Sequence, residues 1–329
     1  MRRIFFILGL LAVVALGAAG GTWQWLKADY QANGPLAVPA TVIIHKGART
    51  IEIATRLKQA GVILDTRMFR WGLRLFADAK PLRAGEYVFK PAMSTARVID
   101  HLQTGKTVIR KVTIAEGLSN LEITELLADL PGLNGLLEPL PTEGQLLPET
   151  YHFSYGDSRM GLVRRMRQAM TRLLTEAWPK RSSGLPLKTP AEALVLASIV
   201  EKETGVASER RRVAGVFINR LRIGMRLQSD PTVIYGITEG REPFGRSITK
   251  SDLRTKTAYN TYVIKGLPPG PITNPGRAAI LAVLNPANTK ELYFVAAGSG
   301  GHAFSRTLRE HNRNVAQWRK IEQVRKREN

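Results

Sequence analysis

The first hydrophobic pattern along the chain is an uninterrupted apolar run. After a tail of residues 1–3 that contains Arg2 and Arg3, residues 4–22 carry no charge and are rich in Leu, Val, Ala, Phe and Gly. A helix of this length spans roughly 28 Å, close to the ~30 Å hydrocarbon core of a bilayer. Because the two arginines precede the run, we predict a cytoplasmic tail, a single transmembrane helix and a remainder outside the cytoplasm. A cleaved signal peptide is the alternative, since residues 15–19 are small enough for a peptidase site.

The pattern changes after a polar segment at 23–40 that contains Gly and Pro and predicts a linker. Residues 41–106 alternate between short strands and amphipathic helices. We expect strands at 41–44 and 85–89, and helices at 50–59, after an Asp65 cap, and after a Ser94 cap up to about Gly105. A connecting βα region follows at 107–147, in which Ser119 and Glu122 form a capping box.

The segment at 159–178 predicts a basic amphipathic helix. Its apolar stripe consists of Val163, Met166, Met170, Leu173 and Ala177. Its arginines (164, 165, 167 and 172) are interpreted as a solvated or headgroup-facing surface.

A second strong helix is predicted at 189–205. Thr189 and Glu192 match a capping box, Pro190 occupies the favoured first helical position, and Gly205 is a natural stop. Glu203 lies four residues after Ile199 and so continues an apolar stripe. A carboxyl group there is partly desolvated, which raises its pKa and keeps the proton that a general acid needs.

Glu201 lies roughly 200° away from Glu203 around this helix, so the two carboxylates do not form a facing pair. On periodicity alone, Glu203 as a helix-terminal residue paired with an arginine remains an alternative. Loops with Gly, Pro, Tyr and amide residues follow the helix. Tyrosine rings stack on sugar faces and amides bridge hydroxyls, so these loops suit a carbohydrate. A β-hairpin is expected over 292–305. The pattern as a whole predicts an α+β fold, with a mixed α+β catalytic domain at 148–329.

The composition limits which classes of partner and cofactor the protein can bind. The formal net charge is +21, and there is no cysteine. The charge predicts an anionic partner, but the exported topology argues against nucleic acid. Neither the histidine spacing nor the absence of cysteine fits a metal site, and no cofactor motif is present.

Five ordered blocks closely resemble the MltG (YceG-like) family of endolytic murein transglycosylases. They are ASIVEKET at 197–204, VFINRL at 216–221, QSDPTV at 228–233, YNTY at 259–262 and GLPPG at 266–270. A shorter stretch, 41–57, resembles the LysM module, which binds glycans containing N-acetylglucosamine. This similarity suggests a LysM-like subdomain at 41–106, and a plain βα unit is the alternative.

The resemblance implies a reaction as well as a fold. The family cleaves the bond between N-acetylmuramic acid (MurNAc) and N-acetylglucosamine (GlcNAc) within nascent strands and leaves 1,6-anhydro-MurNAc ends. One glutamic acid serves first as acid and then as base. That glutamate matches Glu203, with Glu201 as a secondary candidate. The weaker candidates for substrate binding are Thr204, Gln228, Asp230, Tyr259, Asn260 and Asn274. Glu149 stands where relatives often have Asp, which leaves its role open.

The resemblance also implies a location and partners. The protein is expected in the inner membrane, with most of the chain in the periplasm. The expected partners are peptidoglycan glycan strands and peptidoglycan synthases (penicillin-binding proteins). Two other classes of function stay open: an inactive wall-binding scaffold, and a binder of anionic lipid or nucleic acid that rests on the charge alone.

Overall fold

The computed structural model describes residues 2–241, 243–298 and 300–328. The chain divides into two compact units, which are described separately. The first unit consists of Met1–Arg110, Gly132–Asn134 and His152–Asp157. The second consists of Lys111–Pro131, Gly135–Tyr151 and Ser158–Asn329. Most of residues 107–147 therefore belong to the second unit.

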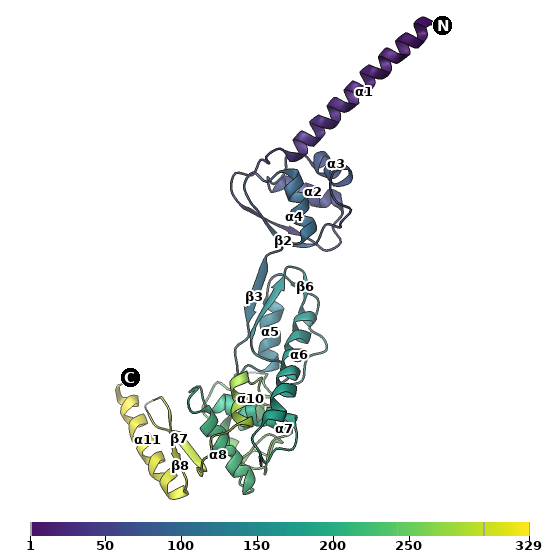
Figure 1. Ribbon diagram of the computed structural model, residues 1–329. Coiled ribbons are helices and arrows are strands. Elements are labelled where there is room, and N and C mark those ends of the chain that lie inside the picture. Colours follow the sequence, from purple (N-terminus) through teal and green to yellow (C-terminus); the bar gives the residue numbers. More distant parts are fainter. Residues whose placement is uncertain (1, 242, 299, 329) are drawn as a thin grey trace. The chain divides into compact units, whose positions relative to one another are not determined.

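After the amino-terminal helix, residues 32–108 of the first unit form two strands and three short helices (Figure 1). The order is β1 (Ala40–Ile44), α2 (Thr50–Gln59), α3 (Thr66–Leu75), β2 (Gly85–Phe89) and α4 (Thr95–Thr104). The strands pair antiparallel, with Val42 opposite Tyr87. Asp65 and Ser94 accept backbone hydrogen bonds at the starts of α3 and α4, and Gly105 ends α4 with a φ of 68°. These boundaries confirm the predicted helices and strands.

Helix α1 (Arg2–Gln31) contains a segment, Ile4–Gln31, that is long and apolar enough to cross a membrane. It continues well beyond residue 22, where the sequence analysis ended the anchor and began a linker. The reason is that no Gly or Pro interrupts residues 23–31, so the helix does not stop. Its last turns pack on the first unit: the ring centroids of Trp23 and Tyr30 lie 4.9 and 5.1 Å from that of Phe76. The irregular segment starts at Ala32.

Helix α5 (Asn120–Asp129) begins with the predicted capping box between Ser119 and Glu122. Strand β3 (Ile109–Thr113) pairs with β5 (Thr150–Ser154), and β4 (Leu133–Asn134) pairs with β6 (Asp157–Ser158). All the sheets in the described part of the chain have two strands.

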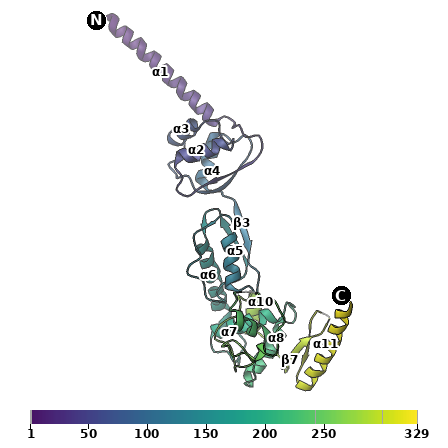
Figure 2. The same ribbon diagram turned by 180° about the vertical axis from the view of Figure 1, so that it is seen from behind.

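The second unit is mainly helical (Figures 1 and 2). Its helices are α5, α6 (Arg159–Ala177), α7 (Pro190–Glu203), α8 (Arg210–Arg222), α9 (Asp230–Thr238), α10 (Arg277–Leu284) and α11 (Leu308–Glu328). Helices α7, α8 and α10 pack on one another and supply most of its hydrophobic core. The five residues of the predicted α6 stripe are all buried.

A hairpin of β7 (Tyr293–Ala296) and β8 (His302–Ser305) follows the helical core, with Phe294 opposite Phe304. Helix α11 packs against both strands, and β7 contacts α8. The hairpin confirms the one predicted over 292–305. Together with the helical core it gives the mixed α+β class expected from the sequence.

Candidate active site

Helix α7 carries Glu203 to the edge of the hydrophobic core. The Thr189 hydroxyl accepts a 3.1 Å hydrogen bond from the Glu192 amide at the start of this helix, and Pro190 fills the first position. Every residue from Ala193 to Val200 is buried. The helix ends at Glu203 because Thr204 is extended. A rigid, buried helix therefore fixes the position of the candidate acid.

Glu203 lines a cleft of about 570 Å³ in the second unit. Residues from α7, α8, α9, the hairpin and α11 line it, so segments far apart in the sequence meet here. The lining residues are Glu203, Arg220, Gln228, Asp230, Tyr262, Tyr293, Phe294, Val295, Ala296, His302, Leu308, His311 and Asn312.

The carboxyl group of Glu203 is enclosed, although the residue as a whole is only half-buried. Its pKa is raised to about 7, mainly by burial and in part by the nearby Asp230 carboxylate. A 2.5 Å hydrogen bond from the Ser229 hydroxyl opposes this rise, as do the positive charges of His302 and Arg220. A carboxyl group with a pKa near 7 exists in both protonation states at neutral pH, which suits a group that first donates and then accepts a proton.

Asp230 supplies a second carboxylate to the cleft. Its Oδ1 accepts a 2.6 Å hydrogen bond from the Tyr262 hydroxyl. The preceding turn is held by Thr261, which accepts hydrogen bonds from the amides of Gln228 and Ser229 at 3.2 and 2.9 Å. The sequence predicted that α7 supplies no carboxylate facing Glu203, and Asp230 comes from a different helix, α9.

A buried cation, Arg220, also lines the cleft. Its side chain donates to the carbonyl oxygens of Leu292 and Leu227 at 2.6 and 2.5 Å, which joins α8 to the hairpin. Burial lowers its pKa, and it is only 7% exposed. Its charge therefore acts in a medium of low polarity, where it favours the carboxylate form of Glu203.

His302 on β8 is oriented by Glu209, the residue before α8. The Glu209 carboxylate accepts from the His302 amide at 3.0 Å and lies 2.7 Å from Nδ1. Burial opposes these contacts, yet they hold the pKa of Glu209 below its ordinary value. A carboxylate at Nδ1 fixes the imidazole ring, as in the triads of hydrolases, and leaves Nε2 for the cleft.

Glu201 has a different environment from Glu203. Its Oε2 accepts a 2.8 Å hydrogen bond from the Gly276 amide at the start of α10, and its Oε1 lies 3.8 Å from Arg210. Burial raises its pKa, and the Gly276 bond opposes the rise. The two glutamates thus face different partners, as the helical spacing predicted.

The weaker candidates separate into two groups. Gln228 and Asp230 line the cleft with Glu203. The others have structural contacts: Tyr259 packs on Tyr235 with ring centroids 4.8 Å apart, and the Thr204 hydroxyl accepts from Val206 at 3.0 Å.

The two asparagines are fully buried. Asn260 donates to the carbonyls of three loop residues, among them Thr255 at 2.7 Å. Asn274 accepts from the Leu146 amide and donates to the Leu118 carbonyl. Both organise loops and lie outside the cleft lining. Glu149, whose role the sequence left open, forms a 3.3 Å ion pair with Arg277.

Sequence reasoning missed Ser229, which bonds Glu203, and several residues that line the cleft: Arg220, Tyr262, His302, His311 and Asn312. Three of them come from the hairpin and α11, which carried no recognised motif and whose histidines were considered only as metal ligands. Among the described residues, no group of three or more metal-binding side chains gathers. The buried Nδ1 of His311 has no hydrogen-bond partner in the described part of the chain. A polar atom of that kind at a cleft wall is a natural contact for a ligand.

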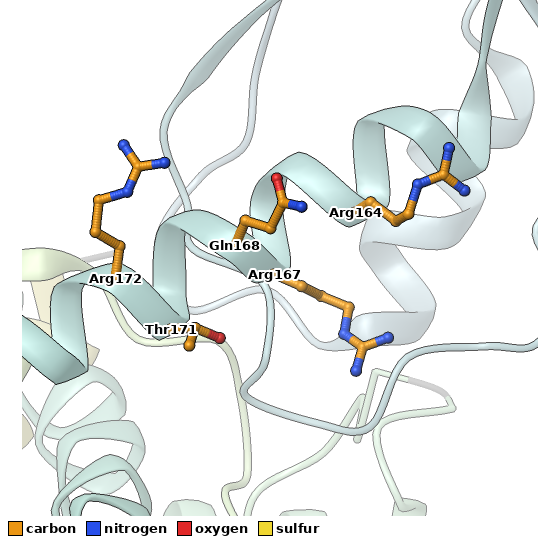
Figure 3. A pocket seen from close by; sticks show the side chains of 5 residues that line it. All are labelled: Arg164, Arg167, Gln168, Thr171 and Arg172. Carbon is orange, nitrogen blue, oxygen red and sulfur yellow. The ribbon is translucent and has the colours of Figure 1, made fainter.

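A shallow hollow on α6 is unrelated to Glu203. Figure 3 shows its lining side chains, which all project from that one helix. The guanidinium groups of Arg164, Arg167 and Arg172 are exposed and point in different directions. They form a solvated basic face rather than a convergent anion site, as the sequence suggested.

Comparison with known proteins identifies a family. The YceG-like family model matches residues 42–317. The chain is 29% identical to the endolytic murein transglycosylase of Bacillus subtilis strain 168, with 82% of each chain covered. It is also 29% identical to the protein of that name from Streptococcus pneumoniae D39, over 95% of this chain and 65% of the relative. The chain thus spans about two thirds of the streptococcal relative.

A crystal structure of a yceG-like protein from Listeria monocytogenes is 31% identical, covers 84% of this chain and 98% of its own, and aligns with a TM-score of 0.48. The family model covers most of the chain, from the first strand into α11. The chain belongs to the YceG-like family.

Proposed function

We propose that this protein is an endolytic lytic transglycosylase of peptidoglycan, with Glu203 as its acid and base. The observation that supports this most directly is the enclosed carboxyl group with a pKa of about 7 in a cleft. The names of its relatives point to the same reaction class. The bond cleaved is the one between MurNAc and GlcNAc within nascent strands, and the cut ends elongation of the strand.

One carboxyl group, that of Glu203, can carry out both proton transfers of the reaction. Protonated Glu203 donates its proton to the glycosidic oxygen, the C1–O bond breaks, and GlcNAc leaves with its 4-hydroxyl. Positive charge develops at the MurNAc C1, and the Asp230 carboxylate, held by Tyr262, stabilises it. The Glu203 carboxylate then accepts the proton of the MurNAc C6 hydroxyl, whose oxygen bonds to C1. The product is a 1,6-anhydro end, no water is consumed, and Glu203 is protonated again.

This scheme differs from that of the hydrolases, in which a second carboxylate activates water or attacks the sugar. The product therefore tests it. Purified peptidoglycan is digested with the full chain in detergent, and the fragments are weighed. We expect ends lighter by one water than reducing ends. Reducing ends would instead mean a hydrolase, and absence of cleavage would favour a wall-binding scaffold.

We further propose a single-pass inner-membrane protein with its bulk in the periplasm. The long apolar segment of α1 and the two arginines before it support this orientation. The partners are glycan strands and penicillin-binding synthases. Reporters fused after α11 test the orientation. We expect a reporter that works only in the periplasm to be active and one that works only in the cytoplasm to be inactive. The reverse pattern would contradict the proposal.

We also propose that the part at 41–106 is LysM-like and binds glycan. The order β1–α2–α3–β2, with the two strands antiparallel, supports this. Binding of a chitin oligomer to the full chain, mapped by protection of first-unit amides, tests it. Protection confined to the second unit would contradict it.

A further inference from the structure

A second hollow of about 610 Å³ lies beside the proposed catalytic cleft. Lys202 and Pro231 line it, whereas their chain neighbours Glu203 and Asp230 line the cleft. Adjacent Cα atoms are only about 3.8 Å apart, so the end of α7 and the start of α9 contribute to the walls of both hollows. A polymer that occupies the cleft therefore has a second site within reach of its nearest substituents.

The rim of this hollow is held by contacts between distant segments. The Ser119 hydroxyl donates to the Gly240 carbonyl at 3.2 Å, which joins the start of α5 to the loop after α9. The Lys202 ammonium lies 3.4 Å from the Gly117 carbonyl, which joins α7 to the turn before α5. The hollow is thus formed by the fold itself and does not depend on a ligand to create it.

The lining combines apolar surface with charges of both signs. Glu122 and Glu125 lie three residues apart on α5, so both face the same side of that helix. The cations are Lys202 and Arg241. The apolar lining residues are Leu121, Pro231, Ile234, Tyr235, Pro243, Phe244 and Ile272.

Some of these charges are already engaged and one is not. The Glu122 carboxylate caps α5 through the Ser119 amide at 2.7 Å, and Arg241 pairs with Glu239 at 2.9 Å. The Glu125 side chain has no hydrogen-bond or ion-pair partner among the described residues. Its carboxylate is therefore open to a cationic group on a ligand.

This chemistry suits a peptide better than a sugar. A strand of N-acetylated sugars is uncharged and is recognised by hydroxyl and amide contacts and by flat ring faces. The peptide stem of peptidoglycan combines alanine methyl groups, carboxylates and, in its diamino acid, an amine. Carboxylates, cations and apolar side chains around one hollow complement those three features.

We propose that this hollow binds the peptide stem of the MurNAc residue next to the cleaved bond. The inference rests on the proposed function for the identity of the polymer, but the binding itself does not need catalysis. The amine of the stem pairs with Glu125, its carboxylates lie toward Lys202 and Arg241, and its methyl groups pack on Ile234 and Phe244.

Binding is tested with the full chain in detergent carrying Glu203→Gln, so that turnover cannot interfere. The probes are the free tripeptide L-Ala-γ-D-Glu-meso-diaminopimelate and, separately, neutral chitotetraose, each followed by calorimetry. We expect Glu125→Lys to weaken tripeptide binding at least about 5-fold and to leave chitotetraose binding unchanged. Glu176→Lys, the same charge change at an exposed position of α6, is the matched control and leaves both unchanged.

Phe244→Ala provides an independent variant that removes apolar contact without a charge change, and it too should weaken the tripeptide. Equal tripeptide affinity in the parent and in both variants overturns the proposal, as does absence of tripeptide binding to the parent. Loss of chitotetraose binding alone would make the hollow a sugar site.

A parallel assay with intact Glu203 compares strands that carry peptides with strands stripped by an amidase. We expect a higher kcat/KM for the strands with peptides and a smaller preference in Glu125→Lys. If neither strand is cleaved, the proposed function fails, and the tripeptide affinities alone decide the binding site.

Discussion

The Ser229 hydroxyl donates a 2.5 Å hydrogen bond to Oε1 of Glu203, and the residue after Ser229, Asp230, places a carboxylate in the same cleft. These two neighbours act on Glu203 in opposite directions. The hydrogen bond stabilises the carboxylate and lowers the pKa, whereas the negative charge destabilises it and raises the pKa. Two consecutive residues, Ser229 and Asp230, thus have opposite effects on the pKa of Glu203.

The first prediction concerns the proton itself. Glu203→Gln keeps the size of the side chain but removes the proton that is donated and regained. We expect glycan cleavage to fall by about 10²–10⁴-fold, the usual contribution of general acid–base catalysis. The measurement is the yield of 1,6-anhydro ends by mass spectrometry. Glu176→Gln on the exposed face of α6 is the control and should cleave like the unchanged chain. Wild-type yield from Glu203→Gln would assign the chemistry to another group.

The second prediction concerns the balance around Glu203. Ser229→Ala removes a contact that lowers the pKa, so the pKa rises above about 7. Because the first step needs the protonated acid, kcat/KM falls as pH increases through this pKa, and that fall should move to higher pH. Asp230→Asn removes a negative charge that raises the pKa of Glu203. In this variant the fall of kcat/KM should therefore move to lower pH. Full pH profiles of both variants provide the measurement. Shifts in the same direction would refute the opposed roles.

The sequence predicted the helical part of this site better than the part formed by loops. Periodicity and caps depend on local interactions, so α7, its Thr189 cap and the orientation of Glu203 were predictable from neighbours within a few residues. The different orientations of Glu201 and Glu203 followed from the rotation of about 100° per residue in an α-helix.

The cleft wall depended on contacts between distant segments. His302 meets Glu209 from 93 positions away, and Arg220 meets Leu292 from 72 positions away. No local pattern encodes such pairs. Asn260 and Asn274 illustrate the reverse case: polar loop residues look like ligand contacts in a sequence, and here their side chains bond buried backbone groups.

The third prediction separates Glu201 from catalysis. Its carboxylate accepts from the Gly276 amide, so Glu201→Ala leaves that buried donor without a partner. We expect the free energy of unfolding to fall by about 1–3 kcal/mol. Glu201→Gln retains an acceptor oxygen and should cleave within a few-fold of the unchanged chain. Urea unfolding and the anhydro-end assay give the two readouts. A loss of cleavage in the folded Gln variant as large as that of Glu203→Gln would make Glu201 catalytic.

The fourth prediction concerns His302 as a positioning residue. Its charge lowers the pKa of Glu203, and Glu209 orients its ring. Glu209→Gln weakens that orientation, so we expect a lower kcat and a pKa of Glu203 shifted upward, visible as a fall in kcat/KM that moves to higher pH. His302→Asn should show the same shift. A purely structural contact would lower stability and leave the pH profile where it was.

The last prediction is a dependence of stability on pH. Burial raises the pKa of Glu203 to about 7 in the folded chain, above the ordinary value of 4.5. The unfolded chain therefore releases this proton at lower pH than the folded chain. Folding carries no cost from this group below about pH 4.5, a growing cost between the two values, and a constant cost above about pH 7.

Glu203→Gln removes that cost, because the amide does not ionise. We expect the variant and the unchanged chain to be equally stable near pH 4.5, and the variant to be more stable near pH 8 by up to about 3 kcal/mol. Glu143, whose pKa burial also raises to about 7, is present in both proteins and cancels in the comparison. Urea unfolding at both pH values gives the measurement. An advantage that is the same at pH 4.5 and pH 8 would mean that the carboxyl group is not desolvated, and the acid role inferred from its burial would lose its physical basis.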